Sequence, residues 1–181
     1  MPRAPRVPQG GPSIFDVDAV VGQTLPEPEG PEPGEGPGPD VGPERTLVIE
    51  ADGGSRGNPG PAAYGALVRD AATGEVLDAE GMTLGVTTNN VAEYSALIAG
   101  LEMARAIDPH AAVDVRMDSR LVVEQMAGRW KVKHPAMKLL FARARLLTPA
   151  VVTWTWVPRE ENKTADALVN AALDGSPRRR Q

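Results

Sequence analysis

The 181-residue sequence contains no cysteine, only two histidines and few aromatic residues. The absence of Cys excludes a disulfide scaffold, a thiolate zinc site and a Cys nucleophile, and it fits a reducing compartment. No apolar run approaches the roughly 18 residues that span a bilayer, and no apolar signal-peptide core follows the first residues. We therefore expect a cytoplasmic protein without membrane association.

Proline, glycine and negative charge are concentrated near the N-terminus. Residues 1–45 hold 11 of the 18 Pro, 8 of the 19 Gly and the whole formal net charge of −5. Because Pro lacks a backbone donor and Gly is costly to order, no helix or strand should continue through this segment. We predict a disordered tail and linker over residues 1–45, one folded domain over residues 46–175 and a basic C-terminal tail over residues 176–181. The apolar stretch at residues 13–21 is either a patch without function or a motif that docks on a protein partner.

Apolar periodicity in the folded part predicts an α/β domain with the element order βββαβααβα. The first three strands should form an antiparallel meander, and crossover units should follow. Strands are expected at residues 46–51, 63–70, 75–84, 112–117 and 151–157. Helices are expected at residues 90–107, around 121–126, and at residues 136–147 and 162–173.

Four acidic residues lie where predicted strands end or predicted helices begin: Asp52, Glu93, Asp118 and Asp166. Taken singly, they have ordinary explanations as a turn residue, a capping-box partner of Asn90, a helix N-cap and a helix-dipole partner. In an open α/β sheet, however, such positions converge on one edge, where ligands bind. Four carboxylates there would repel one another without a divalent cation, and oxygen-only ligands favour Mg²⁺ or Mn²⁺. The sequence therefore predicts a metal cluster for phosphate chemistry.

Two polar segments accompany these acids. Glycines in the loop predicted at residues 53–60 would let backbone N–H groups approach a ligand, and Asn58 adds a neutral hydrogen-bonding group. Residues 87–90 place hydroxyl and amide groups at a helix N-terminus, which suits phosphate.

Charge is divided between two regions of the folded part. Residues 46–119 have a net charge of −7, whereas residues 120–145 have a net charge of +6 and contain Trp130. A run of like charges is often just a solvated helix face. Beside an acidic metal edge, however, a basic strip with an embedded aromatic residue is the layout expected for holding a nucleic-acid backbone.

Four ordered motifs resemble those of the ribonuclease HI family, in a compact form like that of bacterial and archaeal members. They are DGGSRGNPG at residues 52–60, TTNNVAEY at 87–94, MDS at 117–119 and ENKTADAL at 161–168. The resemblance implies the ribonuclease H-like α/β fold, a mixed five-stranded sheet flanked by helices, with a three-strand antiparallel meander plus two parallel strands. It also implies an endonuclease that hydrolyses the RNA strand of RNA/DNA hybrids with two Mg²⁺ ions, Mn²⁺ being an alternative. The products would carry 5′-phosphate and 3′-hydroxyl ends.

The same resemblance gives each acid a catalytic, metal-binding role. Asp52 would bridge the two ions, and Asp166 would help hold the ion that activates the attacking water. Glu93 and Asp118 would hold the ion on the leaving-oxygen side.

Eight further residues are expected to contact the substrate: Gly54, Asn58, Thr88, Asn89, Gln125, Trp130, Lys131 and Lys133. Those near the 2′-hydroxyls that distinguish RNA would be Gly54, Asn89 and Gln125. Asn58, Thr88 and Asn89 would hold the backbone phosphate and sugar, and Trp130, Lys131 and Lys133 would add to the affinity.

The sequence departs from the family pattern in one loop. Many members carry a His before the last helix, whereas residues 157–161 have none, which makes Arg159 the candidate substitute. Two alternatives stay open: a non-catalytic adaptor that binds hybrids, and a nuclease of the same fold that cuts DNA. We expect a monomer without a small-molecule cofactor.

Overall fold

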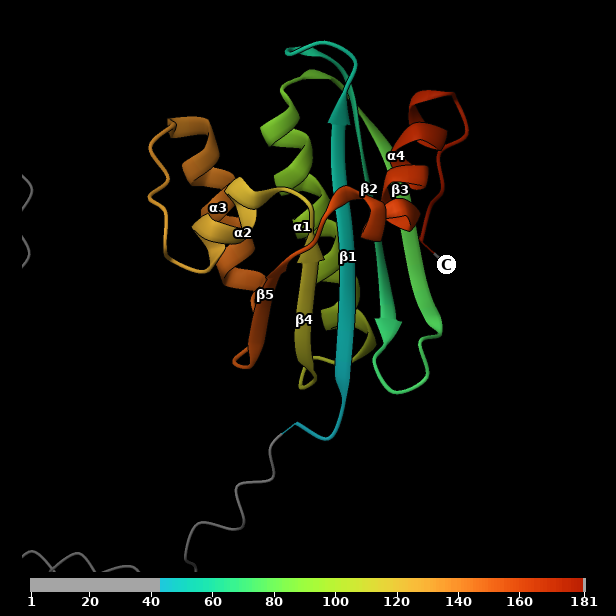
Figure 1. The fold of residues 1–181 in the computed structure, drawn as a ribbon, viewed down its shortest axis with the longest axis vertical. Coiled ribbons are helices and arrows are strands. Elements are labelled where there is room, and N and C mark those ends of the chain that lie inside the picture. Colours follow the sequence, from blue (N-terminus) through green and yellow to red (C-terminus); the bar gives the residue numbers. More distant parts are fainter. Residues whose placement is uncertain (1–42, 181) are drawn as a thin grey trace, which may run out of the picture. The chain divides into compact units, whose positions relative to one another are not determined.

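The structure, a computed structural model, describes residues 43–180. Most of the predicted N-terminal tail lies outside this range. The elements are β1 (Thr46–Ser55), β2 (Gly60–Asp70), β3 (Val76–Thr87), α1 (Asn89–Ile107), β4 (Ala112–Met117), α2 (Arg120–Met126), α3 (Pro135–Leu147), β5 (Val152–Trp156) and α4 (Lys163–Leu173), with a 3₁₀ turn at Arg159–Glu161 (Figure 1). This order is the predicted one. Within the described residues, none of the helices is both long enough and apolar enough to cross a membrane.

The five strands form one mixed sheet in the order β3-β2-β1-β4-β5. β1 pairs antiparallel with β2, and β2 pairs antiparallel with β3. β4 runs parallel to both β1 and β5. The predicted meander with two parallel strands is therefore confirmed, and β1, which carries Asp52, is the central strand.

Helices cover both faces of the sheet (Figure 1). The main core lies between the sheet and α1, α2 and α3, where Ile49, Leu97 and Val115 are fully buried. On the opposite face α4 packs over β1, β2 and β3, with Val169 against Ala63. Burying one such aliphatic side chain stabilises a fold by about 2 kcal/mol. These two layers therefore hold the central strand rigidly in place.

The first strand is longer than predicted. The Gly53-Gly54 pair predicted a loop, but β1 continues through both glycines and stays paired with β2. Gly53 is needed for packing, because a Cβ there would lie 2.2 Å from the backbone nitrogen of Glu93 in α1. The loop predicted over residues 53–60 is therefore wrong for its first positions, and only residues 56–59 lie between the strands.

The C-terminal residues are bound to the domain. After α4, the backbone of Arg178 pairs with Gly81 of β3. The Arg180 guanidinium forms ion pairs with Glu80 and Glu102. The described part of the predicted basic tail thus joins β3 to α1.

Candidate active site

A notch in the sheet lies where β4 ends beside the longer β1. The last β1–β4 pair joins Ala51 to Met117, and β1 runs on past it. Asp52 is the first residue beyond that pair. It lies on the same face of β1 as Gly54, where an added Cβ would meet Val169 of α4. Because β4 has ended, a side chain from α1, on the other face, can reach the same space.

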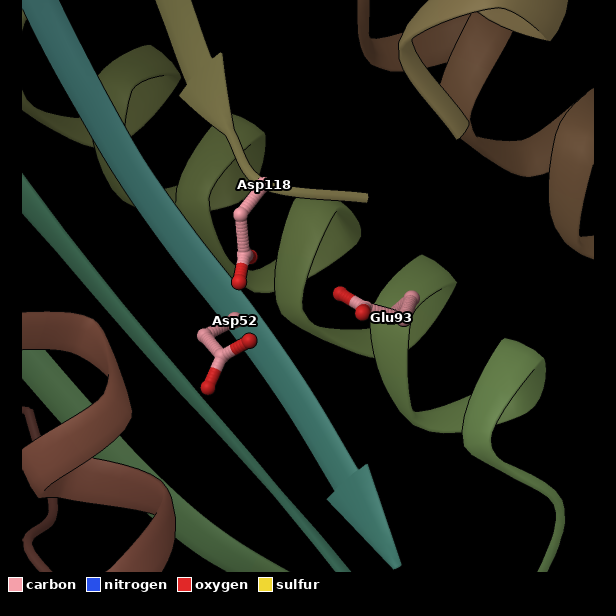
Figure 2. A group of neighbouring side chains, drawn as sticks. All are labelled: Asp52, Glu93 and Asp118. Atoms are coloured by element: carbon pink, nitrogen blue, oxygen red, sulfur yellow. The ribbon is translucent and has the colours of Figure 1, made fainter. Parts of the chain in front are cut away.

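Three of the four predicted carboxylates meet in this notch (Figure 2). Asp52 comes from β1, Glu93 from α1 and Asp118 from the residue after β4. One oxygen of each lies within 4.8 Å of the others. Asp52 and Glu93 are 7% and 6% exposed, so two of the three acids are largely shielded from bulk water.

Burial and repulsion from neighbouring acids disfavour the charged forms of Asp52 and Glu93. The pKa of Asp52 is raised to about 7, chiefly by burial and then by the charges of Asp118 and Asp166, while Arg159 opposes the rise. Burial, followed by the charges of Asp52 and Asp118, also raises the pKa of Glu93 well above its ordinary range. A bound cation would reverse this effect, because it favours ionised carboxylates.

Glu93 is held by β1 and takes no part in capping its own helix. The side chain of Thr88 caps α1 by accepting the N–H of Val91. The capping-box explanation for Glu93 is therefore wrong. Its Oε2 instead accepts the backbone N–H of Gly53 over 3.1 Å, which fixes the carboxylate in the notch.

Asn162 orients Asp118, although it was not among the site residues predicted from the sequence. Its side chain is 1% exposed, and Nδ2 donates to Asp118 Oδ1 over 3.0 Å and to the carbonyl of Ala51 over 2.9 Å. Among the described residues, its Oδ1 has no hydrogen-bond partner. Asn is a common helix N-cap, but at the start of α4 this side chain makes no capping bond. The signal available in the sequence was its place in the fourth motif, at residues 161–168.

Asp166, the fourth predicted acid, lines the same pocket but lies outside the three-carboxylate group. It belongs to the first turn of α4. Its Oδ1 accepts from Arg159 Nη2 over 2.7 Å, and its Oδ2 accepts from Asn170 Nδ2 over 3.0 Å. The pocket has a volume of about 240 Å³ and is lined by all four acids and by Arg159. A guanidinium thus faces the acids from the loop in which many family members carry a His.

The donor set fits a hard divalent cation. Carboxylate oxygens are the ligands that Mg²⁺ and Mn²⁺ prefer. Within the described residues, the pocket lining contains neither a thiolate nor an imidazole. Asp52, Glu93 and Asp118 could hold an ion together, and Asp166 could contribute from the other side of the pocket.

Four of the predicted substrate contacts gather at the N-terminus of α1. Asn58 Oδ1 accepts the backbone N–H of Asn89 over 3.1 Å, which ties the β1–β2 turn to the helix. Asn58 and Thr88 line a groove of about 440 Å³ that also includes His134. Gly54 and Asn89 line the carboxylate pocket.

Gln125 is placed differently from the expectation. It is 6% exposed, its Oε1 accepts from the hydroxyl of Tyr94 over 2.7 Å, and its Nε2 donates to the carbonyl of Lys131 over 3.4 Å. The amide thus makes its two hydrogen bonds inside the fold.

The remaining predicted contacts lie on residues 128–134, which we term the basic segment. It connects α2 to α3 and carries Trp130, Lys131 and Lys133, all of them at least partly exposed. These three residues do not line the carboxylate pocket. The segment ends at His134, which lines the groove beside Thr88.

Sequence comparisons identify relatives of the whole folded part. The family model described as "Reverse transcriptase-like" matches residues 50–172. The bifunctional protein Rv2228c of Mycobacterium tuberculosis is 52% identical over 132 residues, which cover 72% of this chain and 36% of that protein. The chain therefore spans about a third of the length of the first curated relatives. Ribonuclease HI of Halobacterium salinarum is 44% identical over 138 residues, covering 74% of this chain and 68% of the relative.

Solved structures give the same result. The N-terminal RNase H domain of Rv2228c from Mycobacterium tuberculosis aligns with a TM-score of 0.69 at 51% identity, over 73% of this chain and 96% of that one. LC11-RNase H1 in complex with an RNA/DNA hybrid aligns with a TM-score of 0.67 at 42% identity, over 72% of this chain and 98% of that one. Together with the four acids in one pocket, these matches show that the chain belongs to the ribonuclease HI family.

Proposed function

We propose that this chain is an endoribonuclease that hydrolyses the RNA strand of RNA/DNA hybrids with two divalent metal ions. The observation that carries the proposal is the gathering of Asp52, Glu93 and Asp118 within 4.8 Å in the notch of the sheet. Family membership supports the reaction. The similarity to LC11-RNase H1, whose structure was solved with an RNA/DNA hybrid, supports the substrate.

Mg²⁺ is the proposed metal, and Mn²⁺ is the alternative. Asp52, at the centre of the notch, would contact both ions, and Asp166 would contact the ion beside the attacking water. Glu93 and Asp118 would contact the ion beside the leaving oxygen. When bound, the ions would supply Lewis-acid stabilisation of the phosphate and an ionised water, so that the products carry 5′-phosphate and 3′-hydroxyl ends.

The chain's own residues prepare this site before any ion binds. The Gly53 N–H orients Glu93, and the Asn162 amide orients Asp118. Carboxylates that are already oriented bind a metal with less reordering. Arg159 faces Asp166 and is the proposed replacement for the family's loop His. A guanidinium keeps its charge at all working pH values, so Arg159 would donate hydrogen bonds to a phosphate and would not carry protons.

The proposed substrate path starts at the N-terminus of α1. The groove lined by Asn58 and Thr88 would hold a backbone phosphate, since the positive end of the α1 dipole favours an anion there. Gly54 and Asn89, which line the carboxylate pocket, would lie near a 2′-hydroxyl. Trp130 and the lysines of the basic segment would contact the duplex farther from the cut. Gln125 is left out of this set because it is buried.

A cleavage assay with four labelled duplexes of one sequence tests the proposal. The full chain with Mg²⁺, and separately with Mn²⁺, should cut the RNA strand of the RNA/DNA hybrid and leave the RNA/RNA and DNA/DNA duplexes intact. In the fourth duplex, a hybrid with 2′-O-methyl groups on the RNA strand, cutting should stop. End-labelling should detect 5′-phosphate on the product. Binding of the hybrid without cutting would indicate an adaptor, and cutting of DNA would indicate a DNA nuclease; either result overturns the proposal.

Other features remain predictions from the sequence. They are the division into residues 1–45, 46–175 and 176–181, the cytoplasmic location, the monomeric state, the lack of a small-molecule cofactor and a protein partner for the N-terminal tail.

A further inference from the structure

Two consecutive hydrogen bonds, the first buried and the second partly buried, link α1 to the basic segment. The Tyr94 hydroxyl, 0% exposed, donates to Gln125 Oε1 over 2.7 Å. Gln125 Nε2 then donates to the carbonyl of Lys131 over 3.4 Å. Tyr94 directly follows Glu93 in α1, so this pair of bonds starts one residue from an acid of the notch and ends on a lysine of the basic segment.

The orientation of this amide is determined by its neighbours. The Lys131 carbonyl can only accept a hydrogen bond, whereas the Tyr94 hydroxyl can donate one. Gln125 must therefore present its oxygen to Tyr94, which leaves its NH₂ group for the Lys131 carbonyl. The amide thus has one partner in α1 and one in the basic segment.

Other contacts fix the two ends of the basic segment, and its middle is held by Val132 and by the bond from Gln125. At the start, the Glu124 carbonyl accepts the N–H groups of Arg129 and Trp130. At the end, His134 Nδ1 accepts the N–H of Ala136 and caps α3. Between them Val132 packs against the main core. The Gln125 amide thus acts at Lys131, one of the two residues between the fixed ends that carry an exposed cation.

The two lysines of the basic segment are available for a ligand. In residues 43–180, Arg129 is paired with Glu124, but no ion pair involves Lys131 or Lys133. Both side chains are exposed, and they project from a segment whose backbone is anchored. A cation on an anchored backbone loses less conformational entropy when it binds phosphate than one on a loose loop.

We propose that Gln125 is a positioning residue for nucleic-acid binding, acting through the backbone of Lys131 to set the path of the basic segment. Its effect on substrate rests on the proposed ribonuclease function. Gln125 does not touch the duplex; it determines where Trp130, Lys131 and Lys133 meet the phosphates. Its loss should therefore weaken substrate binding and leave the chemistry in the notch unchanged.

Four variants separate this role from a general loss of stability. Gln125→Met keeps the length of the side chain but removes both hydrogen bonds. Gln125→Met leaves the Tyr94 hydroxyl without an acceptor. The double variant Y94F/Q125M also removes that hydroxyl, so that no buried donor is left without a partner. Tyr94→Phe alone keeps the Gln125–Lys131 bond. Val122→Ala, in the buried face of the same helix, is the matched control that removes packing without touching the segment.

The first measurement needs no nucleic acid. Hydrogen exchange of the full chain, followed by mass spectrometry, should show faster exchange over residues 128–134 in Q125M and Y94F/Q125M than in the natural chain. In Y94F and V122A the exchange of this segment should stay at the natural rate. Unchanged exchange in Q125M and in the double variant would overturn the proposal, whatever substrate the protein acts on.

The second measurement uses hybrid cleavage with Mg²⁺. Q125M and Y94F/Q125M should raise KM about fivefold, the scale of one lost hydrogen bond, with kcat within twofold of the natural chain. They should also flatten the dependence of log(1/KM) on log[salt]. V122A should lower Tm and keep KM. If the natural chain does not cut hybrids, only the proposed function is contradicted. If it cuts hybrids, and both Gln125 variants keep its KM and its salt slope, the positioning role is overturned.

Discussion

Gly53 donates its N–H to Glu93 Oε2 over 3.1 Å, and its Cα lies so close to α1 that a Cβ would come within 2.2 Å of the Glu93 nitrogen. One residue therefore both permits the close approach of α1 to β1 and orients an acid of the notch. Gly53 thus sets both the distance between α1 and β1 and the position of the Glu93 carboxylate.

Gly53→Ala should consequently damage both fold and site. The added Cβ meets helix backbone, which cannot rotate away, so α1 must move and the unfolding free energy should fall by about 3 kcal/mol, the upper range of overpacking. Urea unfolding monitored by circular dichroism measures this. Gly54→Ala is the matched control, because its Cβ would meet only the tip of Val169 at 3.1 Å. A loss in G53A no larger than in G54A would contradict the packing argument.

Asn162→Ala should slow the reaction without weakening substrate binding. The variant removes the amide that holds Asp118 Oδ1, so Asp118 would have to be reoriented each time metal binds. Loss of such an orienting partner typically costs 10- to 100-fold in activity or metal affinity. We expect kcat at saturating Mg²⁺ to fall about tenfold, the Mg²⁺ concentration for half-maximal rate to rise and KM for the hybrid to stay within twofold. A change in KM alone would show that Asn162 acts on substrate instead.

Without metal, the natural chain should lose stability as the pH rises from about 4 to about 7. Asp52 ionises near its ordinary pKa of 3.8 in the unfolded chain and near 7 in the folded one, so between these values the folded state holds the extra proton. Stability must then fall with rising pH across this window. At pH 8 in a chelator, Asp52→Asn should be more stable than the natural chain by up to about 4 kcal/mol, because the pKa of Asp52 differs between the two states by about three units and one unit corresponds to about 1.4 kcal/mol.

Glu75→Gln is the control for this pH effect, since Glu75 lies on an exposed turn outside the carboxylate pocket. Its stability profile should follow the natural one between pH 4 and 8. At pH 8, Mg²⁺ should raise the unfolding free energy of the natural chain and change that of D52N only slightly. If the unfolding free energies of D52N and the natural chain changed equally with pH, the pKa of Asp52 would not be raised in the folded protein.

Lys131 and Lys133 changed together to Ala should reduce the salt dependence of hybrid binding. Each phosphate contact that is lost lowers the slope of log K against log[salt] by up to about 0.9. Fluorescence anisotropy with a labelled hybrid at several salt concentrations, without divalent metal, measures the slope. Arg105→Ala, an exposed cation at the far end of α1, should leave it unchanged. An unchanged slope in the double variant would place the basic segment away from the duplex.

Local pattern was sufficient to predict most of the fold. The strand at Ala112–Met117 was predicted to the residue, and the helix at Asn89–Ile107 to within one, since its apolar spacing is regular and Pro109 follows. The extension of β1 through Gly53 could not be predicted locally, because its cause is the approach of a helix that begins 36 residues later in the chain. Nor does the alternation of residues 152–156 show that Trp156 is 48% exposed at the end of an edge strand, where its indole N–H donates to the Asp118 carbonyl.

Motif spacing located the acids but not the groups that orient them. All four predicted carboxylates line one pocket. The amide of Asn162 could not be assigned, because the same residue type at a helix start normally caps the helix. Gln125 was assigned to the surface although its neighbours Val122, Val123 and Met126 mark a buried helix face. Which side of a short helix faces the core depends on the tertiary packing, and a seven-residue helix gives too few turns to determine it.

The most direct test of the central claim is the rate of hybrid cleavage by Asp118→Asn beside the natural chain, both with saturating Mg²⁺. The variant keeps an oxygen that can accept from Asn162, so the fold should be retained and Tm should not fall. Metal ions supply several kcal/mol of transition-state stabilisation, so we expect the natural chain to cut the RNA strand and D118N to be slower by about 100-fold or more. No cleavage by the natural chain, or equal rates for the two proteins, would contradict the account.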